Sequence, residues 1–143
     1  MLDASLFEAP ATAEERANAL RAARMMGYTL FRAATRMTHA PDGSAQLTER
    51  IENRGAAPFY YVWPAELEAL DVSGKVVARA RADWPLPSLL PGRKAEWSAE
   101  LRAAPETIRT VLLEIANPMP GGRPVAFANA EMGTAQNGWL TLQ

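Results

Sequence analysis

Residues 60–83, with the sequence YYVWPAELEALDVSGKVVARARAD, decide the fold class. Apolar and polar side chains alternate on both sides of the turn-forming residues 71–74, DVSG. Alternation with a period of two is typical of a strand with one buried face, and a short Gly-containing turn between two such runs is typical of a hairpin. The stretch therefore predicts two antiparallel strands, over residues 60–70 and 75–83.

The side chains of this hairpin favour one register. With Leu70 opposite Lys75, large inward residues such as Leu67 meet small alanines, and Glu66 lies opposite Arg79 on the outer face. Contacts between large and small side chains fill a core layer, and a pair of opposite charges stabilises the solvent-exposed face of a sheet. Because a slip of one residue would reverse both faces, the sequence predicts this pairing.

Similar short runs recur along the rest of the chain, separated by Gly, Pro, Asn and Asp residues. Residues 84–92, WPLPSLLPG, contain three prolines and are expected to form an irregular crossing loop rather than a central strand. The expected strands are residues 25–37, 46–53, 60–70, 75–83, 94–101, 108–117, 124–130 and 139–142. Such a succession predicts a mostly-β fold, an immunoglobulin-like or fibronectin-like antiparallel β-sandwich of seven or eight strands.

The N-terminal part of the chain has a different composition. Residues 12–24, TAEERANALRAAR, are rich in Ala, Glu and Arg, which favour a helix. Thr12 followed by Glu15 three residues later is a capping-box pattern that marks the helix start. We therefore divide the chain into an N-terminal tail and short helix (residues 1–24, a candidate linker remnant) and one β-sandwich domain (residues 25–143).

Composition argues against several classes of function. The 143 residues suit one domain, and 48% hydrophobic with 22% charged residues are ordinary globular values. A net charge near −1 argues against a nucleic-acid partner. With no Cys and the single His39, no metal or cofactor is predicted. The sequence contains no bilayer-spanning apolar run and no signal-peptide pattern, so no membrane contact is predicted and the compartment stays open.

Two groups of polar side chains are weighed as catalytic candidates. Glu66 and Glu68 lie two apart on one strand face, within the separations that glycoside hydrolases use for paired carboxylates. The predicted register gives the first of them an arginine partner, which favours a solvated surface. His39 precedes a turn that contains Asp42 and Ser44, but no nucleophile-elbow motif occurs. We therefore predict no catalytic residue in this chain.

Aromatic side chains form the other candidate site, because sugars stack on flat aromatic faces through their apolar C–H groups. Alternation along the predicted strand directs Tyr61 and Trp63 inward, toward the core. Tyr60, Trp84 and Trp139 are left as exposed platforms, and these three are the ligand-binding residues that the sequence predicts.

Several turn motifs carry a resemblance to a known family. A segment of the type N-x-G-x-A-P-x-Y is formed by Asn53, Gly55, Ala57, Pro58 and Tyr60; a W-x-PG-like loop is matched loosely by Trp84 with Pro91 and Gly92; and a closing segment is formed by Asn137, Gly138 and Trp139. Over residues 24–142 the chain resembles a C-terminal β-sandwich domain of unknown function. That domain follows a TIM-barrel-like domain in bacterial proteins predicted to be glycoside hydrolases.

The resemblance implies a fold and an adjacent catalytic domain, and it implies no reaction for this chain itself. In such proteins the barrel is expected to carry the acid and base carboxylates, and a barrel of roughly 200 residues or more does not fit in this chain beside a sandwich. The expected function is a non-catalytic accessory module that supports or orients the catalytic domain of a carbohydrate-active enzyme. Such a module should expose an apolar patch around the helix and one sheet face, to bind a catalytic barrel or a second copy of the chain.

Two alternatives stay open at this point. One is a carbohydrate-binding module that uses the three candidate aromatic platforms on a glycan. The other is a small hydrolase that uses Glu66 and Glu68. The sequence also leaves open whether a barrel precedes Met1 in an exported parent protein or whether the sandwich stands alone.

Overall fold

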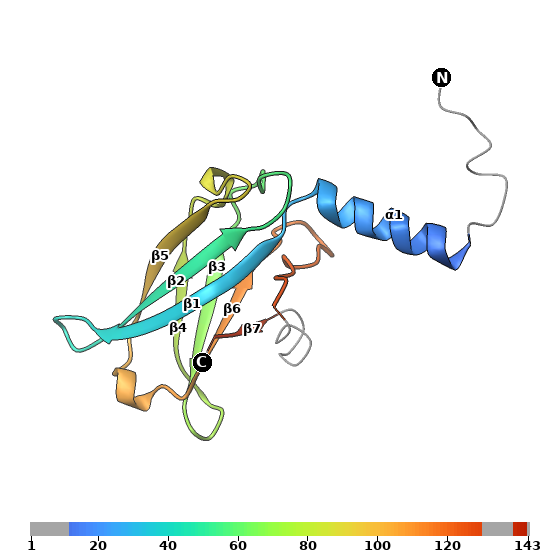
Figure 1. Cartoon of the computed structure of the whole chain (residues 1–143). Helices are drawn as coiled ribbons and strands as arrows, with labels where there is room; N and C mark the ends of the chain where they lie inside the picture. The colour runs from blue at the N-terminus through green and yellow to red at the C-terminus, as the bar shows by residue number, and fades with distance from the viewer. Residues whose placement is uncertain (1–11, 130–138, 143) are drawn as a thin grey trace.

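The computed structural model describes residues 12–129 and 139–142, which form two antiparallel sheets around one core (Figure 1). One sheet has the strand order β1-β2-β5 and the other β4-β3-β6-β7. The strands are β1 (Leu30–His39), β2 (Ala45–Asn53), β3 (Ala65–Leu70), β4 (Val76–Ala82), β5 (Lys94–Leu101), β6 (Thr110–Ile115) and β7 (Leu140–Thr141). The predicted mostly-β sandwich is confirmed, with seven strands in the described ranges, and its immunoglobulin-like or fibronectin-like subtype stays a prediction.

The core lies between the two sheets. Along β2 every second residue from Ala45 to Asn53 is buried, as the alternating pattern predicts for a strand with one inward face. The connections β2 to β3, β4 to β5 and β5 to β6 each pass from one sheet to the other. The largest fully buried apolar side chains are Phe59, Leu30, Leu47, Ile51, Leu67, Leu86, Leu89, Leu101, Leu113, Ile115 and Leu140.

The β3–β4 hairpin forms, but its predicted register is wrong by two residues. Glu68 rather than Glu66 lies opposite Arg79, and Nε of Arg79 donates to Oε1 of Glu68 at 2.8 Å. The loop is longer than expected because Leu70 pairs with Val76, and a bulge interrupts the ladder beside this pair. A shift of two leaves every side chain on its own face, so alternation alone does not distinguish the two registers.

Several predicted element bounds are also corrected. Helix α1 (Ala13–Met26) continues two residues past its predicted end, and β1 begins only at Leu30. Residues 60–64 are not strand, because β3 begins only after Pro64, which has no backbone N–H for a ladder. Residues 124–129, predicted as a strand, run in the structure without strand assignment, and Ala130 lies outside the described residues.

Residues 84–92 form the predicted irregular crossing and contain one 3-10 helix, Leu86–Ser88. Trp84 is buried here, so the prediction that it is an exposed platform is wrong. Its indole Nε1 donates to the carbonyl oxygen of Ser98 at 3.1 Å, and its ring centroid lies 5.7 Å from that of Trp97. The crossing loop therefore closes the core, and Trp84 could meet a glycan only if this loop left the sandwich.

Asn53, at the end of β2, ties three segments of the chain together. Its buried side-chain Oδ1 accepts from the backbone N–H groups of Thr29 (3.2 Å) and Gly55 (3.0 Å). Its Nδ2 donates to the carbonyl oxygens of Ala57 (2.8 Å) and Leu89 (3.1 Å). The amide thus uses both of its donors and both of its acceptor positions. It joins the start of β1, the turn after β2 and the crossing loop.

Gly55 lies where two backbone segments approach closely. A Cβ atom at this position would stand 2.2 Å from the carbonyl oxygen of Gly27 and 2.6 Å from the backbone nitrogen of Thr29. The same Gly27 oxygen accepts from the backbone N–H of Ala56 at 2.9 Å. Asn53 and Gly55, which open the motif that carries the family resemblance, therefore have structural roles in this chain.

Residues 124–129, which we call the strap, cross from the end of β6, where the backbone N–H of Val125 donates to the carbonyl oxygen of Ile115 at 3.1 Å, to the outer edge of β1. The backbone N–H of Ala128 donates to the carbonyl oxygen of Leu30 at 2.8 Å. The side chain of Asn129 accepts from the backbone N–H of Arg32 at 2.8 Å and donates to the carbonyl oxygen of Arg32 at 2.9 Å. These contacts hold β1 next to the bulge in its pairing with β2.

Helix α1 projects away from the sandwich (Figure 1). It starts with the predicted capping box: Thr12 Oγ1 accepts from Glu15 N at 3.2 Å, and Glu15 Oε2 accepts from Thr12 N at 2.7 Å. The helical side chains that the structure describes, at residues 13–19, 21, 22 and 26, are all exposed. Within the described residues no helix has the length and apolar character needed to cross a membrane.

Candidate functional site

Four aromatic rings meet near the base of α1, and we call them the aromatic cluster: Tyr28, Phe59, Tyr61 and Trp63. The buried Phe59 is central, with edge-to-face contacts to Tyr28 (centroids 4.8 Å apart), Tyr61 (5.7 Å) and Trp63 (5.1 Å). Tyr61 in turn stacks on Trp63, with centroids 5.1 Å apart and an interplanar angle of 18°. Aromatic pairs in these geometries each contribute about 0.5–1.5 kcal/mol beyond the contribution of the apolar area that they bury. These contacts therefore stabilise the arrangement of the four rings.

Large apolar side chains around this cluster are exposed. Tyr60 is 72% exposed and Tyr61 is 52% exposed. Met26, Tyr28 and Val62 are exposed as well. Together these five residues form what we call the aromatic surface. Single exposed apolar residues need no explanation, but these five fall in two short segments, residues 26–28 and 60–62, which flank the backbone bonds of Gly27 to Ala56 and Ala57, and such a concentration is typical of a binding surface.

Backbone hydrogen bonds join the residues that follow α1 to the turn that precedes the aromatic run. The carbonyl oxygen of Gly27, directly after α1, accepts from the backbone N–H groups of Ala56 (2.9 Å) and Ala57 (3.3 Å). The backbone N–H of Arg54 donates to the carbonyl oxygen of Thr29 at 2.8 Å. Residues 27–29 and 54–57, two segments far apart in sequence, are thereby fixed relative to each other, so the chain leaves α1 at a defined place beside the aromatic surface.

A hollow of about 440 Å³ lies beside the cluster, between the start of β1 and the strap. It is lined by Tyr28, Thr29, Ala126, Phe127 and Ala128. Burial raises the pKa of Tyr28, so its hydroxyl stays protonated at neutral pH and can donate a hydrogen bond. The hollow therefore extends the aromatic surface with a small recess whose lining side chains are apolar apart from the hydroxyl groups of Tyr28 and Thr29.

The three predicted platforms do not form one site. Tyr60 is exposed, as predicted, whereas Trp84 is buried in the crossing loop. Trp139 is half-buried, and the residues directly before it lie outside the described ranges. Among the described residues, neither tryptophan has a ring contact with the aromatic cluster.

The site contains residues that the sequence analysis missed or misplaced. Tyr61 was expected to point inward, but it lies over Trp63 because residues 60–64 belong to a crossing segment and not to a sheet. Tyr28 and Phe59 were not assigned to any site. Pro58 and Pro64, which bracket the aromatic run, are the sequence signal that could have indicated a non-strand crossing here.

The carboxylate pair proposed for hydrolysis lies on the outer face of the β4-β3-β6-β7 sheet. Glu68 is bound by Arg79, and Glu66 lies between its two cross-strand neighbours, Arg81 on β4 and Glu114 on β6. Burial and the charges of Glu66 and Glu68 raise the pKa of Glu114. In residues 12–129 and 139–142 no group of three or more His, Asp and Glu side chains could hold a metal ion.

The polar residues near His39 form two separate pairs rather than a triad. The imidazole Nε2 of His39 lies 3.3 Å from Oε2 of Glu106. The buried Ser44 donates from Oγ to Oδ1 of Asp42 at 2.6 Å, and its backbone N–H donates to the same oxygen at 2.9 Å. Ser44 is thus held in a turn, where its hydroxyl is engaged by a carboxylate.

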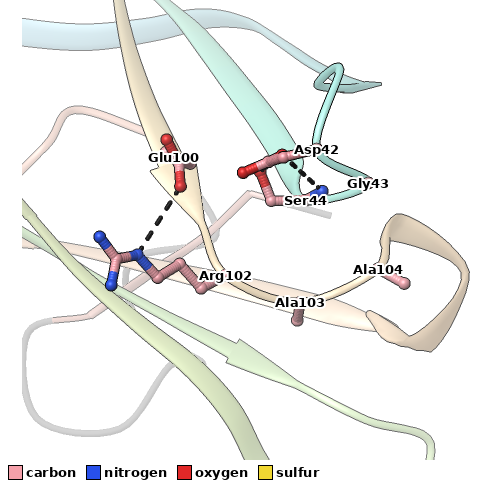
Figure 2. A pocket seen from close by; sticks show the side chains of 7 residues that line it. All are labelled: Asp42, Gly43, Ser44, Glu100, Arg102, Ala103 and Ala104. Atoms are coloured by element: carbon pink, nitrogen blue, oxygen red, sulfur yellow. Dashed lines mark hydrogen bonds and ion pairs between the residues drawn. The ribbon is translucent and has the colours of Figure 1, made fainter.

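A shallow polar hollow of about 420 Å³ adjoins this turn (Figure 2). Its charged lining residues are Asp42, Glu100 and Arg102, and Nε of Arg102 lies 3.7 Å from Oε1 of Glu100. The Ser44 hydrogen bonds lower the pKa of Asp42, so this carboxylate is ionised at neutral pH. Asp42 is bonded to Ser44, and Glu100 lies near Arg102, so the charged groups that line this hollow already have partners within the chain. The arrangement is typical of solvent-exposed loops at the end of a sandwich.

Comparisons with known proteins found no match for this chain among family models, curated proteins or solved structures.

Proposed function

We propose that this chain is a non-catalytic accessory module of a carbohydrate-active enzyme. It docks on the catalytic domain through α1 and the aromatic surface. One observation carries the proposal: large exposed apolar side chains lie at the base of a helix that packs little on its own sandwich. The family resemblance of residues 24–142 supports the choice of a catalytic barrel as the partner.

The energetics of α1 favour a partner. Helices shorter than about 12–15 residues are only marginally stable alone in water, and α1 has 14 residues with its described side chains exposed. Its capping box contributes only about 1 kcal/mol. Contact with a second body would supply the tertiary packing on which most helical stability depends.

Orientation is the second part of the proposal. Because the carbonyl oxygen of Gly27 is held by Ala56 and Ala57, a partner that contacts α1 and Tyr60 would be fixed relative to the whole sandwich. A module of this kind positions its catalytic domain without contributing a reacting group. The local pairing of Glu68 with Arg79, and of Ser44 with Asp42, is consistent with chemistry that belongs to the partner.

Hydrogen–deuterium exchange of α1 tests the proposal. In the isolated chain we expect the amides of residues 17–26 to exchange within about tenfold of unstructured rates, because little packing holds the helix. With the catalytic domain of the natural protein present, whether on the same chain or a separate one, we expect their protection to rise at least tenfold. The amides of β2 serve as the control and should be protected in both samples.

Two outcomes would contradict the proposal. One is strong protection of α1 in the isolated monomer, which would mean that the helix needs no partner. The other is unchanged α1 exchange when the catalytic domain is present at saturating concentration.

A second candidate function is glycan binding, favoured by the exposed Tyr61 ring stacked on Trp63. Sugars use such a face through apolar C–H contacts. Titration with a polysaccharide panel, followed by tryptophan fluorescence, distinguishes the two functions. A saturable response that Tyr61→Ala removes would favour glycan binding, and no response to any polysaccharide is expected for the docking module.

A further inference from the structure

Glu49 occupies the core of the sandwich. It lies at the centre of β2 on the inward face, between Leu47 and Ile51, and its exposed fraction is 0%. Oε2 of Glu49 accepts a hydrogen bond from Oγ1 of Thr35 on β1 at 2.9 Å. Oε1 is also buried and has no hydrogen-bond partner among the described residues. A carboxyl group in this position is costly to ionise, since burial removes the water that would solvate its charge.

The surroundings of Glu49 contain little compensating charge. Arg32 on β1 is the charged group that faces it, and Trp97 is its cross-strand neighbour on β5. The buried residues that β3, β6, β7 and the strap add to the core are apolar apart from Asn129: Ala65, Leu67, Ala69, Val111, Leu113, Ile115, Leu140, Val125 and Phe127. The carboxyl group therefore meets one guanidinium and one hydroxyl in an otherwise apolar environment.

The balance of these effects raises the pKa of Glu49 to about 7. Burial is the largest cause, while the hydrogen bond from Thr35 and the charge of Arg32 act in the opposite direction. The carboxyl group is therefore mainly neutral below pH 7 and mainly ionised above it, whereas in the unfolded chain it ionises near its ordinary value of 4.5.

We propose that Glu49 acts as a proton-linked latch on β1: the strand is held closed while the carboxyl group is neutral and loosens when it ionises. β1 is the outer strand of its sheet, and the bulge between Arg32 and Ala34 interrupts its ladder just before Thr35. On its other side the strap holds it through Asn129, again at Arg32. An ionised Glu49 would draw water into the core beside this bulge, where the ladder between β1 and β2 is interrupted. The latch does not depend on what docks at the aromatic surface.

The sign of the pH dependence follows from linkage. The folded chain holds the Glu49 proton to a higher pH than the unfolded chain does, so the stabilisation is complete below pH 4.5 and is lost as the pH rises through 7. Between pH 5 and pH 9 this single group should raise the unfolding equilibrium constant on the order of 100-fold. Glu49→Gln removes the titrating proton but keeps the shape of the side chain.

The test compares urea unfolding of the natural chain, Glu49→Gln and the exposed control Glu96→Gln at pH 5 and pH 9. From pH 5 to pH 9, the unfolding equilibrium constant of the natural chain and of the control should rise about 100-fold more than that of the Glu49→Gln chain. Exchange of the Thr35 amide, corrected for intrinsic rates, should also accelerate with pH in the natural chain and in the control, but not in the Glu49→Gln chain. Equal pH dependence in all three chains would overturn the proposal.

A measurement on the unsubstituted chain covers the case in which Glu49→Gln fails to fold. Carbon-13 NMR of the glutamate carboxyl groups should show one resonance with a midpoint near 7, assigned to Glu49 through its β2 backbone. Titration of Glu49 with a midpoint near 4.5 in the folded chain would contradict the latch.

Discussion

Gly55→Ala should be the most damaging small substitution in this chain, with an expected loss of about 3 kcal/mol in the free energy of unfolding. The added Cβ would stand 2.2 Å from the carbonyl oxygen of Gly27, and that oxygen already accepts two backbone hydrogen bonds. Relief requires separating the base of α1 from the turn after β2. Urea unfolding followed by tryptophan fluorescence measures the loss.

Gly43 provides the matched control for this prediction. It has φ = +85°, and a Cβ there would meet nothing within 4 Å. Gly43→Ala should cost about 1 kcal/mol through backbone strain, and Gly43→Asn less, because Asn tolerates this conformation better. Gly55→Asn should be at least as damaging as Gly55→Ala, since the obstacle there is contact with backbone. Equal losses at the two glycines would contradict the close approach.

Asn53→Ala is the second large effect, with an expected loss of about 3 kcal/mol. Truncation leaves the backbone N–H groups of Thr29 and Gly55 and the carbonyl oxygens of Ala57 and Leu89 without their partner. Buried polar groups left unpaired incur their full desolvation cost. Loss of this one amide should therefore loosen the start of β1 and the crossing loop together, as a lower urea midpoint and faster exchange of both segments.

Asn53→Asp separates the acceptor role of the side chain from its donor role. The carboxylate keeps the contacts to the two N–H groups but faces the carbonyl oxygens of Ala57 and Leu89 without a proton to donate. Burial and these oxygens should raise the folded pKa of the new carboxyl group, so stability is highest at low pH and is lost as the pH rises.

Asn117→Ala is the matched control, because Asn117 makes comparable bonds to Met119 and Arg123 in an exposed loop. It should cost about 1 kcal/mol. If Asn53→Ala cost no more than this, Asn53 would not tie the three segments together.

The alternation of apolar and polar residues was sufficient to predict the architecture. It predicted the two-sheet sandwich and the hairpin between β3 and β4, and the three prolines predicted the irregular crossing at residues 84–92. Alternation did not predict the register of the hairpin, because two registers that differ by two residues have the same alternation. The registers that pair Arg79 with Glu66 or with Glu68 place the same side chains on the same faces, and only the five-residue loop and its bulge distinguish them.

Whether a side chain in a crossing segment is buried or exposed was harder to predict. Outside a paired strand the period of two does not hold, so the prediction that Tyr61 points inward is wrong. Trp84, left as an exposed platform in the irregular loop, is buried. The buried Trp84 contacts Ser98 and Trp97 on β5, and no local sequence pattern contains these contacts. Glu49 is different: its parity with Leu47 and Ile51 does place it inward, and this signal was present in the sequence.

Photo-cross-linking at the aromatic surface tests the docking claim most directly. A benzophenone amino acid replaces Tyr60 in the full-length natural protein, produced in its own cells, and the matched control carries it at Val72, an 89% exposed apolar residue at the tip of the β3–β4 hairpin. Mass spectrometry identifies the cross-linked peptides. The account predicts links from position 60 to a carbohydrate-active catalytic domain and none to that domain from position 72. Links from position 60 only to a second copy of this chain, or equal links from both positions, would contradict it.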